Sequence, residues 1–205
     1  MTLLELKTNS RAALDEATAA LFTDVDILGW INEAERDIAA KTGCLEAVVT
    51  TLKTTNGSRL VAFTGNLVND VEYAGGSLIH ITPSQMGHIP LRGITTPQYW
   101  FQWGSYIVIE PKPDAAYDLV VYVSQSPSTE MSTNAHVPEI LLEFQEAIVP
   151  YVTMMGKLKA KKYADAAAKY GEYIIILQSL INTYMRRIPA GLMDIRLPDA
   201  TVVRQ

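Results

Sequence analysis

The chain has 205 residues, 48% of them hydrophobic, and a formal net charge of −5 at neutral pH. This is enough apolar sequence for one sizeable domain or two closely joined lobes, and the acidic balance gives no global basic field of the kind that indicates nucleic-acid binding. Cys44 is the only cysteine, which excludes a disulfide framework and a cysteine metal site.

The beginning of the chain mixes charged residues with apolar ones and contains no apolar segment typical of a signal peptide. No stretch approaches the roughly 18 apolar residues of a membrane-spanning helix. We therefore expect a protein that is made and used in a cytosol and has no membrane partner.

Two helices are predicted at the start of the chain, the first over residues 3–14. In the second, Thr23 is the expected N-cap residue and Asp26 can return a hydrogen bond to it. Gly43 stands where a left-handed C-cap residue is expected. Between them the apolar residues recur at helical spacing and form one core-facing stripe: Ile27, Trp30, Ile31, Ala34 and Ile38.

From about residue 46 the apolar period changes to two, which predicts β-strands. Four short strands are expected over residues 47–54, 59–63, 70–73 and 77–81, followed by one helical turn at 82–86. Asn56-Gly57, between the first two strands, is typical of a tight hairpin turn.

The most regular pattern runs from Pro97 to Val123. It predicts a strand over residues 99–103, a two-residue turn, a returning strand over 106–110 and a third strand over 117–123, together an antiparallel meander.

The aromatic residues Tyr99, Trp100 and Trp103 allow two interpretations, strand packing or a ligand-binding surface. Side chains alternate along a strand, so Trp100 points to the face opposite Tyr99, Phe101 and Trp103. The rings therefore do not form one platform, which favours packing.

The pattern returns to helix after a polar connector at residues 127–137. A helix is expected from residue 138 to 162, with a kink at Pro150. A last helix is expected over 163–187, where Ala164, Ala167, Ala168 and Gly171 would let a neighbouring helix approach closely. Residues 188–205 form a tail that contains helix breakers but more large aliphatic residues than a disordered segment usually has.

We therefore expect an α+β protein: a small helical bundle from the N- and C-terminal helices, an inserted antiparallel β module and an extended C-terminal tail. The predicted domains are residues 1–45 (bundle helices), 46–126 (β domain), 127–187 (bundle helices) and 188–205 (tail). Acidic residues gather in the first helical region and basic ones between 156 and 187. Such asymmetry could orient an oligomer or a docking partner, and solvated helix faces explain it equally well.

Residues that carry chemistry are scattered. His80, His88 and His136 lie far apart without a second ligand at metal spacing. Ser84 near His88 lacks the glycines of a nucleophile elbow, and the carboxylates at Glu110 and Asp114 flank a turn. No catalytic, metal or cofactor site is predicted, and the protein is expected not to be an enzyme.

The ordered set of motifs is similar to the head-tail connector (adaptor) proteins of tailed bacteriophages. It comprises LGWINEAERDIAAKTG, then PQYWFQWGSYIVIEPKPDAAYDLVVY, an EFQEAIVPY helix and an alanine-rich helix with KYGEY. The resemblance implies a helical bundle with an inserted β domain, of which about twelve copies form a closed ring beneath the portal. It further implies contact with the portal protein and with the next neck or tail protein, and a location at the head-tail junction of the virion after assembly in the host cytoplasm.

Several residue roles follow from the resemblance alone. By position, the tail is implied to bind the portal through Leu192, Met193, Ile195, Arg196, Leu197, Val202 and Val203. Arg186 and Arg187 are possible contacts to packaged DNA that passes through the ring, which would be non-specific and salt-sensitive. The alternatives that remain are a neck stopper or tail-completion protein and, in another class, a β-rich carbohydrate-binding module in which Trp100 or Trp103 stacks on sugar.

Overall fold

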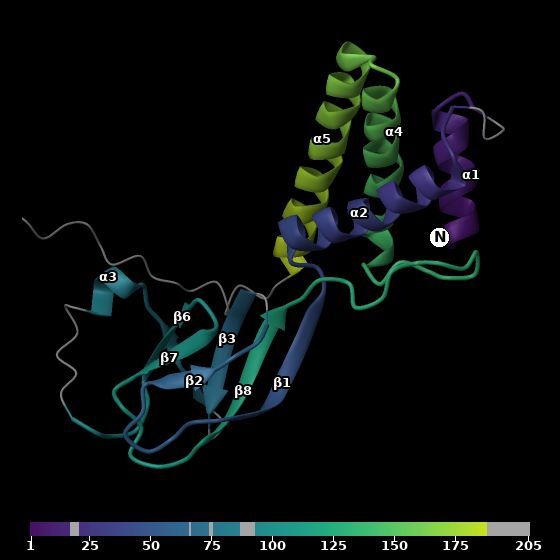
Figure 1. Ribbon diagram of the computed structural model, residues 1–205. Helices are drawn as coiled ribbons and strands as arrows, with labels where there is room; N and C mark the ends of the chain where they lie inside the picture. Colours follow the sequence, from purple (N-terminus) through teal and green to yellow (C-terminus); the bar gives the residue numbers. More distant parts are fainter. Residues whose placement is uncertain (17–20, 66, 74–75, 87–92, 188–205) are drawn as a thin grey trace, which may run out of the picture. The chain divides into compact units, whose positions relative to one another are not determined.

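A computed structural model describes residues 1–16, 21–65, 67–73, 76–86 and 93–187, without the side chains of 184–187. The chain divides into two compact units, shown in Figure 1. Of the described residues, the helical unit contains those in 1–34 and 131–187, and the β unit contains those in 35–130. Helices and mostly antiparallel sheets confirm the predicted α+β class.

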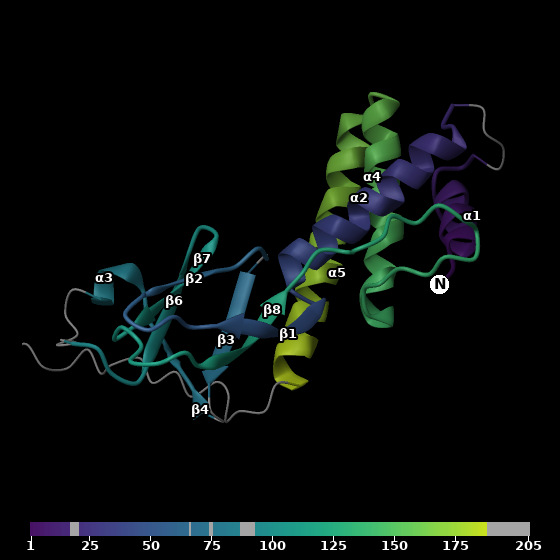
Figure 2. The same ribbon diagram turned by 60° about the horizontal axis from the view of Figure 1, so that its bottom comes forward.

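The helical unit is built around one buried helix, α4 (Ile148–Lys159). Figures 1 and 2 both show α4 between α1 (Leu3–Ala13) and α5 (Tyr163–Arg187). The first part of α2 (Asp24–Thr42) completes the unit. The sequence of α4 explains its place, because it carries no charged residue before Lys157 and its side chains are buried on most sides.

The predicted cap of α2 is confirmed. The backbone N–H of Asp26 donates to Thr23 Oγ1 at 3.1 Å, and the N–H of Thr23 donates to Asp26 Oδ2 at 2.9 Å. Gly43 has a φ of 63° directly after the helix, as expected of a left-handed C-cap residue. A second capping box, between Thr2 and Glu5, begins α1.

The predicted helix from residue 138 is wrong at its start. Residues 138–141 are not helical, a 3₁₀ helix η1 (Leu142–Ala147) comes next, and α4 begins only at Ile148. Pro150 therefore lies in the first turn of α4, where its missing N–H would have no partner inside the helix. For this reason the expected kink within a long helix does not apply.

The last helix begins and ends where the sequence predicts, and it contacts α4 through one side only. Ala166, Tyr173 and Leu177 are buried, and the rings of Tyr173 and Tyr151 lie 5.3 Å apart. The small residues that were expected to receive a neighbouring helix are exposed instead: Ala164, Ala167, Ala168 and Gly171. Within the described residues, no helix of the same chain covers them.

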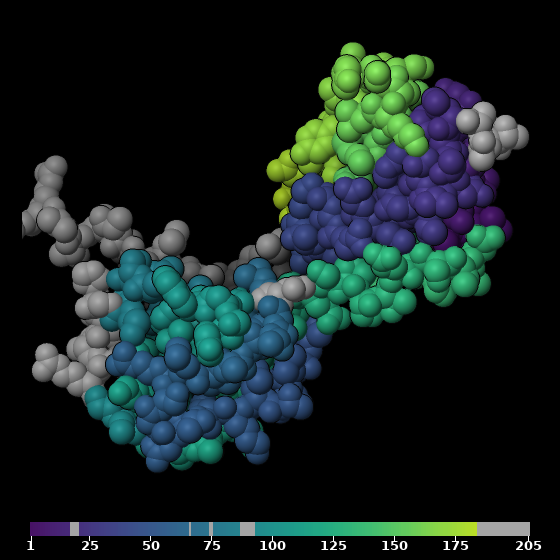
Figure 3. All heavy atoms as spheres, viewed as in Figure 1, coloured from purple at the N-terminus to yellow at the C-terminus, as the bar shows by residue number. Residues whose placement is uncertain are grey.

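The second half of the predicted connector, from Met131 onward, belongs to the helical unit and lies along it (Figure 3). The buried side chain of Asn32 donates to the carbonyl of Met131 at 3.1 Å and accepts from its N–H at 3.0 Å. At the start of α1, the N–H groups of Leu3 and Leu4 donate to the carbonyls of His136 and Asn134. The bonds from Leu3 and Leu4 satisfy N–H groups in the first turn of α1 that would otherwise lack partners.

The β unit is a pair of four-stranded sheets. Sheet A has the order β1 (Glu46–Lys53), β8 (Asp118–Ser124), β3 (Leu67–Tyr73) and β4 (Gly76–Ser77). Sheet B has the order β2 (Leu60–Ala62), β7 (Tyr106–Glu110), β6 (Tyr99–Trp103) and β5 (Ile79–His80). Only the β5–β6 pair is parallel among the strand pairs of these sheets.

The main core of the β unit lies between the inner faces of the two sheets. It combines residues of sheet A, such as Val71 and Val121, with residues of sheet B, such as Trp100 and Ile107. A smaller cluster covers the outer face of sheet B, where Ile81 packs beside α3 (Pro83–Met86). The helical turn at α3 was predicted correctly.

Two pairings expected from the sequence are wrong. Asn56-Gly57 forms a turn, but the strands on either side of it, β1 and β2, belong to different sheets. The β6–β7 hairpin is confirmed, with Trp103 opposite Tyr106, whereas β8 pairs with β1 and β3 and so does not complete a meander. The expected strand at 77–81 divides at Leu78, which is buried in the core, and its two parts join different sheets.

The reason for these differences lies in how the strands are buried. Both faces of β7 are covered, whereas β8 buries only alternate residues. A strand with one buried face can close either sheet of a sandwich, and local sequence does not say which.

Candidate interaction surfaces

The aromatic segment is divided between the core and the surface. Trp100 is 1% exposed and lies between the sheets, whereas Tyr99 and Phe101 pack on the opposite face of sheet B. This confirms the predicted alternation and the packing interpretation for Trp100. Trp103, at the end of the β6–β7 hairpin, is 64% exposed.

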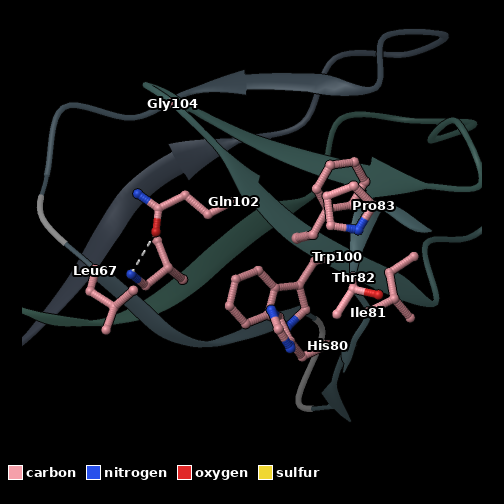
Figure 4. Close-up of a pocket in the computed structure, with 10 residues that line it drawn as sticks. Leu67, His80, Ile81, Thr82, Pro83, Trp100, Gln102 and Gly104 are labelled. Carbon is pink, nitrogen blue, oxygen red and sulfur yellow. Dashed lines mark hydrogen bonds between the residues drawn. The ribbon is translucent and has the colours of Figure 1, made fainter. Parts of the chain in front are cut away.

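A groove of about 440 Å³ lies beside Trp100, at the side of sheet B where β5 ends (Figure 4). His80 covers the indole, with the two ring centres 4.7 Å apart, and Gln102 Oε1 accepts a hydrogen bond from the N–H of Val68 at 3.0 Å. No carboxylate, lysine or arginine is among its described lining residues: Leu67, Val68, His80, Ile81, Thr82, Pro83, Trp100, Phe101, Gln102 and Gly104. Because His80 covers its ring, Trp100 is not available to stack on a sugar.

Three exposed apolar side chains form a second surface, the Trp103 patch, on the outer face of sheet B. It consists of Leu60, Trp103 and Tyr106. Trp103 and Tyr106 are direct cross-strand partners, so their rings are neighbours. Exposed tryptophan and tyrosine are typical of protein–protein contacts.

The side of α5 that points away from Tyr173 forms a third surface, which we call the α5 outer face. Its six exposed residues are Ala164, Ala168, Gly171, Ile175, Gln178 and Asn182. They are spaced alternately four and three residues apart, the spacing of a coiled-coil seam. None of them is charged, and Ile175 is 70% exposed.

The opposite edge of the helical unit is formed by α1 and the turn that leads to α2. Leu4, Thr8 and Ala12 are exposed, four residues apart, and we call them the α1 outer face. Leu21 and Val25, further along, are also exposed. The buried side of α1 faces α4, because a Cβ atom at Gly156 would lie 2.5 Å from a methyl carbon of Leu14.

Charges of both signs gather at one end of the helical unit. Lys159 Nζ lies 2.6 Å from Asp26 Oδ2, and Arg11 forms an ion pair of the same length with Asp24. Hydrogen bonds from Lys159 and Thr23 lower the pKa of Asp26 to about 2. Part of the acidic and basic asymmetry of the sequence is therefore used inside the unit.

The residues proposed from the sequence fall into two groups. Ile27, Ile31, Ala34 and Ile38 are buried, and Trp30 is half-buried, with Lys159 Nζ 5.9 Å from its ring centre. All seven tail residues proposed for the portal lie outside the described residues, and so do the side chains of Arg186 and Arg187.

Among the described residues, no group of three histidine, cysteine or acidic side chains could hold a metal ion. Of the three histidines, His80 packs on Trp100, and His136 Nδ1 accepts a hydrogen bond from the N–H of Ser132 at 3.1 Å. His88 lies outside the described residues. In the same part of the chain, no helix has the length and apolar content needed to cross a membrane.

Sequence reasoning missed the role of Asn32 and the unpartnered side of α5. A helical projection of residues 163–187 would have revealed the second feature, because it separates an uncharged seam from the seam that contains Tyr173. Nothing in the sequence marks Asn32, since its two hydrogen bonds join residues 99 positions apart.

The comparison with known proteins agrees with this architecture. Residues 1–195 match the family described as SU10 adaptor protein, a range that includes both units and the first part of the tail. No curated protein matches the chain. The chain therefore belongs to the SU10 adaptor protein family, which confirms its resemblance to the head-tail adaptors of tailed bacteriophages.

Proposed function

We propose that this phage structural adaptor is a portal-bound head-tail connector. About twelve copies would form a closed ring that joins the capsid to the tail and extends the DNA channel. The observation that carries this proposal is the family match over residues 1–195, because it spans the helical unit, the β unit and the first part of the predicted docking tail. The ring would reside at the head-tail junction of the virion after assembly in the host cytoplasm.

The tail is the proposed portal-binding segment. Between residues 188 and 205 its sequence contains the aliphatic residues Leu192, Ile195, Leu197 and Val202. Burial of such side chains on a partner gives a favourable hydrophobic contribution. The portal protein is the proposed partner.

Two further partners belong to the proposal. The Trp103 patch is a suitable contact for the next neck or tail protein, since it is apolar, exposed and separate from the tail in sequence. Packaged DNA would pass the ring without sequence-specific contacts. Arg186 and Arg187, at the end of α5, are the proposed backbone contacts.

A carbohydrate-binding module is the second candidate, and one observation favours it, the exposure of Trp103. A glycan-binding screen on the wild-type protein and on Trp103→Ala tests this function. We expect no glycan to bind either protein, and binding that is lost with Trp103 would favour the second candidate.

The decisive experiment is the mass of the full-length chain, alone and with its portal, by native mass spectrometry. Two variants accompany it, one ending at Ile188 and one ending at Pro198. The expected result is a large ring that requires the portal and is lost when the chain ends at Ile188. The variant ending at Pro198 separates the contribution of residues 192–197 from that of the last residues.

Each other outcome has a definite meaning. A chain that stays monomeric with its portal would overturn the connector function. A ring that forms on the portal without the tail would retain the function and move the docking site elsewhere. Binding to a neck or tail protein but not to the portal would identify a stopper or tail-completion protein.

A further inference from the structure

We infer that neighbouring copies contact each other through opposite edges of the helical unit. The α5 outer face of one copy would pack against the α1 outer face of the next. This inference rests on the proposed ring and names the partner surface within it, a second copy of this chain.

The first argument is that the α5 outer face is composed for packing. A solvated helix face normally carries charged residues, yet none occurs among six residues that span Ala164 to Asn182. The charged neighbours Lys169 and Glu172 stand beside this seam and pair with each other at 2.6 Å. In the middle of the seam, Ile175 exposes 70% of its surface.

The second argument is the spacing of this seam. Its residues follow a four-three alternation, and Ala166, Tyr173 and Leu177, which pack against α4, lie seven and four residues apart and so share one side of the same heptad pattern. A helix with two such seams is suited to lie between two other helices. Within the described residues α4 occupies one seam, and the outer seam is exposed to solvent.

The third argument is that the opposite edge offers a matching surface. Leu4, Thr8 and Ala12 present small side chains and one leucine on the exposed side of α1. Small residues on both helices allow the close interaxial distance of about 8–10 Å that helix packing requires. Because the two surfaces lie on different edges of one unit, the contact is heterologous and can repeat around a ring.

Charge complementarity identifies a second copy as the partner. The contact between Leu14 and Gly156 shows that the C-terminal ends of α1 and α4 lie at the same end of the unit. The turn after α1 carries exposed Asp15, and the turn after α4 carries exposed Lys161 and Lys162. Copies placed side by side in one orientation bring the basic turn of one copy beside the acidic turn of the next.

Paired cysteines test this contact on the ring assembled with the portal. Ala168→Cys and Ala12→Cys are made singly and together, and the rings are treated with a flexible bis-maleimide. The expected result is a ladder of covalently linked copies for the double variant only. The single variants report the background from buried Cys44, and a pair of Ala168→Cys with Val48→Cys, on the outer face of β1, is the matched control.

A second variant measures the energetic contribution of the interface. Ile175→Lys places a charge in the seam, and Val48→Lys is the control at another exposed aliphatic residue. Both variants should keep the melting temperature of the wild type, because the side chains of Ile175 and Val48 are exposed. Ile175→Lys should raise the concentration needed for ring assembly roughly tenfold or more, and Val48→Lys should leave it unchanged.

The outcomes separate this inference from the proposed function. Rings of the expected mass that give no ladder, or that tolerate Ile175→Lys, would overturn the contact and leave the connector function standing. If the unmodified chain forms no ring with the portal, the connector function is overturned and the inference with it.

Discussion

Replacing Trp100 with alanine removes the largest fully buried side chain of the described residues. It stands between two hydrogen-bonded sheets, whose strands cannot move inward to fill the space, so most of the cavity should remain. Large-to-small changes of this kind cost about 3–5 kcal/mol. Loss of the ring contact with His80 adds to this cost, and its share is about 0.5–1.5 kcal/mol.

The indole nitrogen does not add to the cost, because Trp100 Nε1 is buried and has no hydrogen-bond partner among the described residues. Trp100→Phe keeps an aromatic ring and removes this unpaired donor. Trp100→Phe should therefore cost about 1–2 kcal/mol of stability, less than the alanine variant.

Urea unfolding followed by far-ultraviolet circular dichroism measures these changes. A loss of about 4 kcal/mol lowers the midpoint by roughly 1–4 M for a typical urea slope. If the two units unfold separately, the shift belongs to the transition of the β unit. Trp103→Ala is the matched control and should change stability by less than about 0.5 kcal/mol, because its side chain is exposed. Equal losses from Trp100→Ala and Trp103→Ala would refute the assignment of Trp100 to the core.

Three further predictions concern the helical unit. Gly156→Ala should be less stable than the control Gly29→Ala by about 1–3 kcal/mol in urea unfolding. The new methyl group at residue 156 would lie 2.5 Å from Leu14, whereas the one at residue 29 would have no neighbour within 4 Å. Equal stabilities of the two variants would contradict this close packing. Asn32→Ala leaves two backbone groups of the connector without partners and should cost about 2–4 kcal/mol, so a change below 1 kcal/mol would argue against their burial. The pKa of Asp26 is lowered from 3.8 to about 2 in the folded protein, so its ion pair stabilises the fold above about pH 4 and is lost as the pH falls toward 2. The difference in melting temperature between the wild type and Asp26→Asn should accordingly shrink between pH 5 and pH 2, and a constant difference would count against the pairing.

The features predicted correctly from the sequence depend on residues close together in the chain. The cap of α2 involves Thr23 and Asp26, three positions apart, and the β6–β7 hairpin turns through two residues. Hydrogen bonds of this kind form within one helical turn or one tight turn, so their sequence signals are local. The apolar stripe of α2 likewise identifies its buried side from periodicity alone.

Other features depended on tertiary contacts. The expected pairing of β1 with β2 and the expected meander both failed, because each strand pairs with a partner chosen by packing between the two sheets. The start of α4 moved from residue 138 to Ile148 because the connector before it is held by Asn32 and by the N-terminus of α1. Distant residues make these contacts, and no short stretch of sequence contains both partners.

The exposed seam of α5 shows the same division. Its bounds, Tyr163–Arg187, and its small residues could be read from the sequence, and so could the family through the order of its motifs. Which seam packs inside the chain and which stays exposed was decided by α4, which buries Tyr173 and leaves Ile175 in solvent. The sequence by itself determined where the helices, turns and most strands form, because those depend on local hydrogen bonds and periodicity. Only the tertiary structure decided which faces remain available to partners, since burial depends on the elements that pack from elsewhere in the chain.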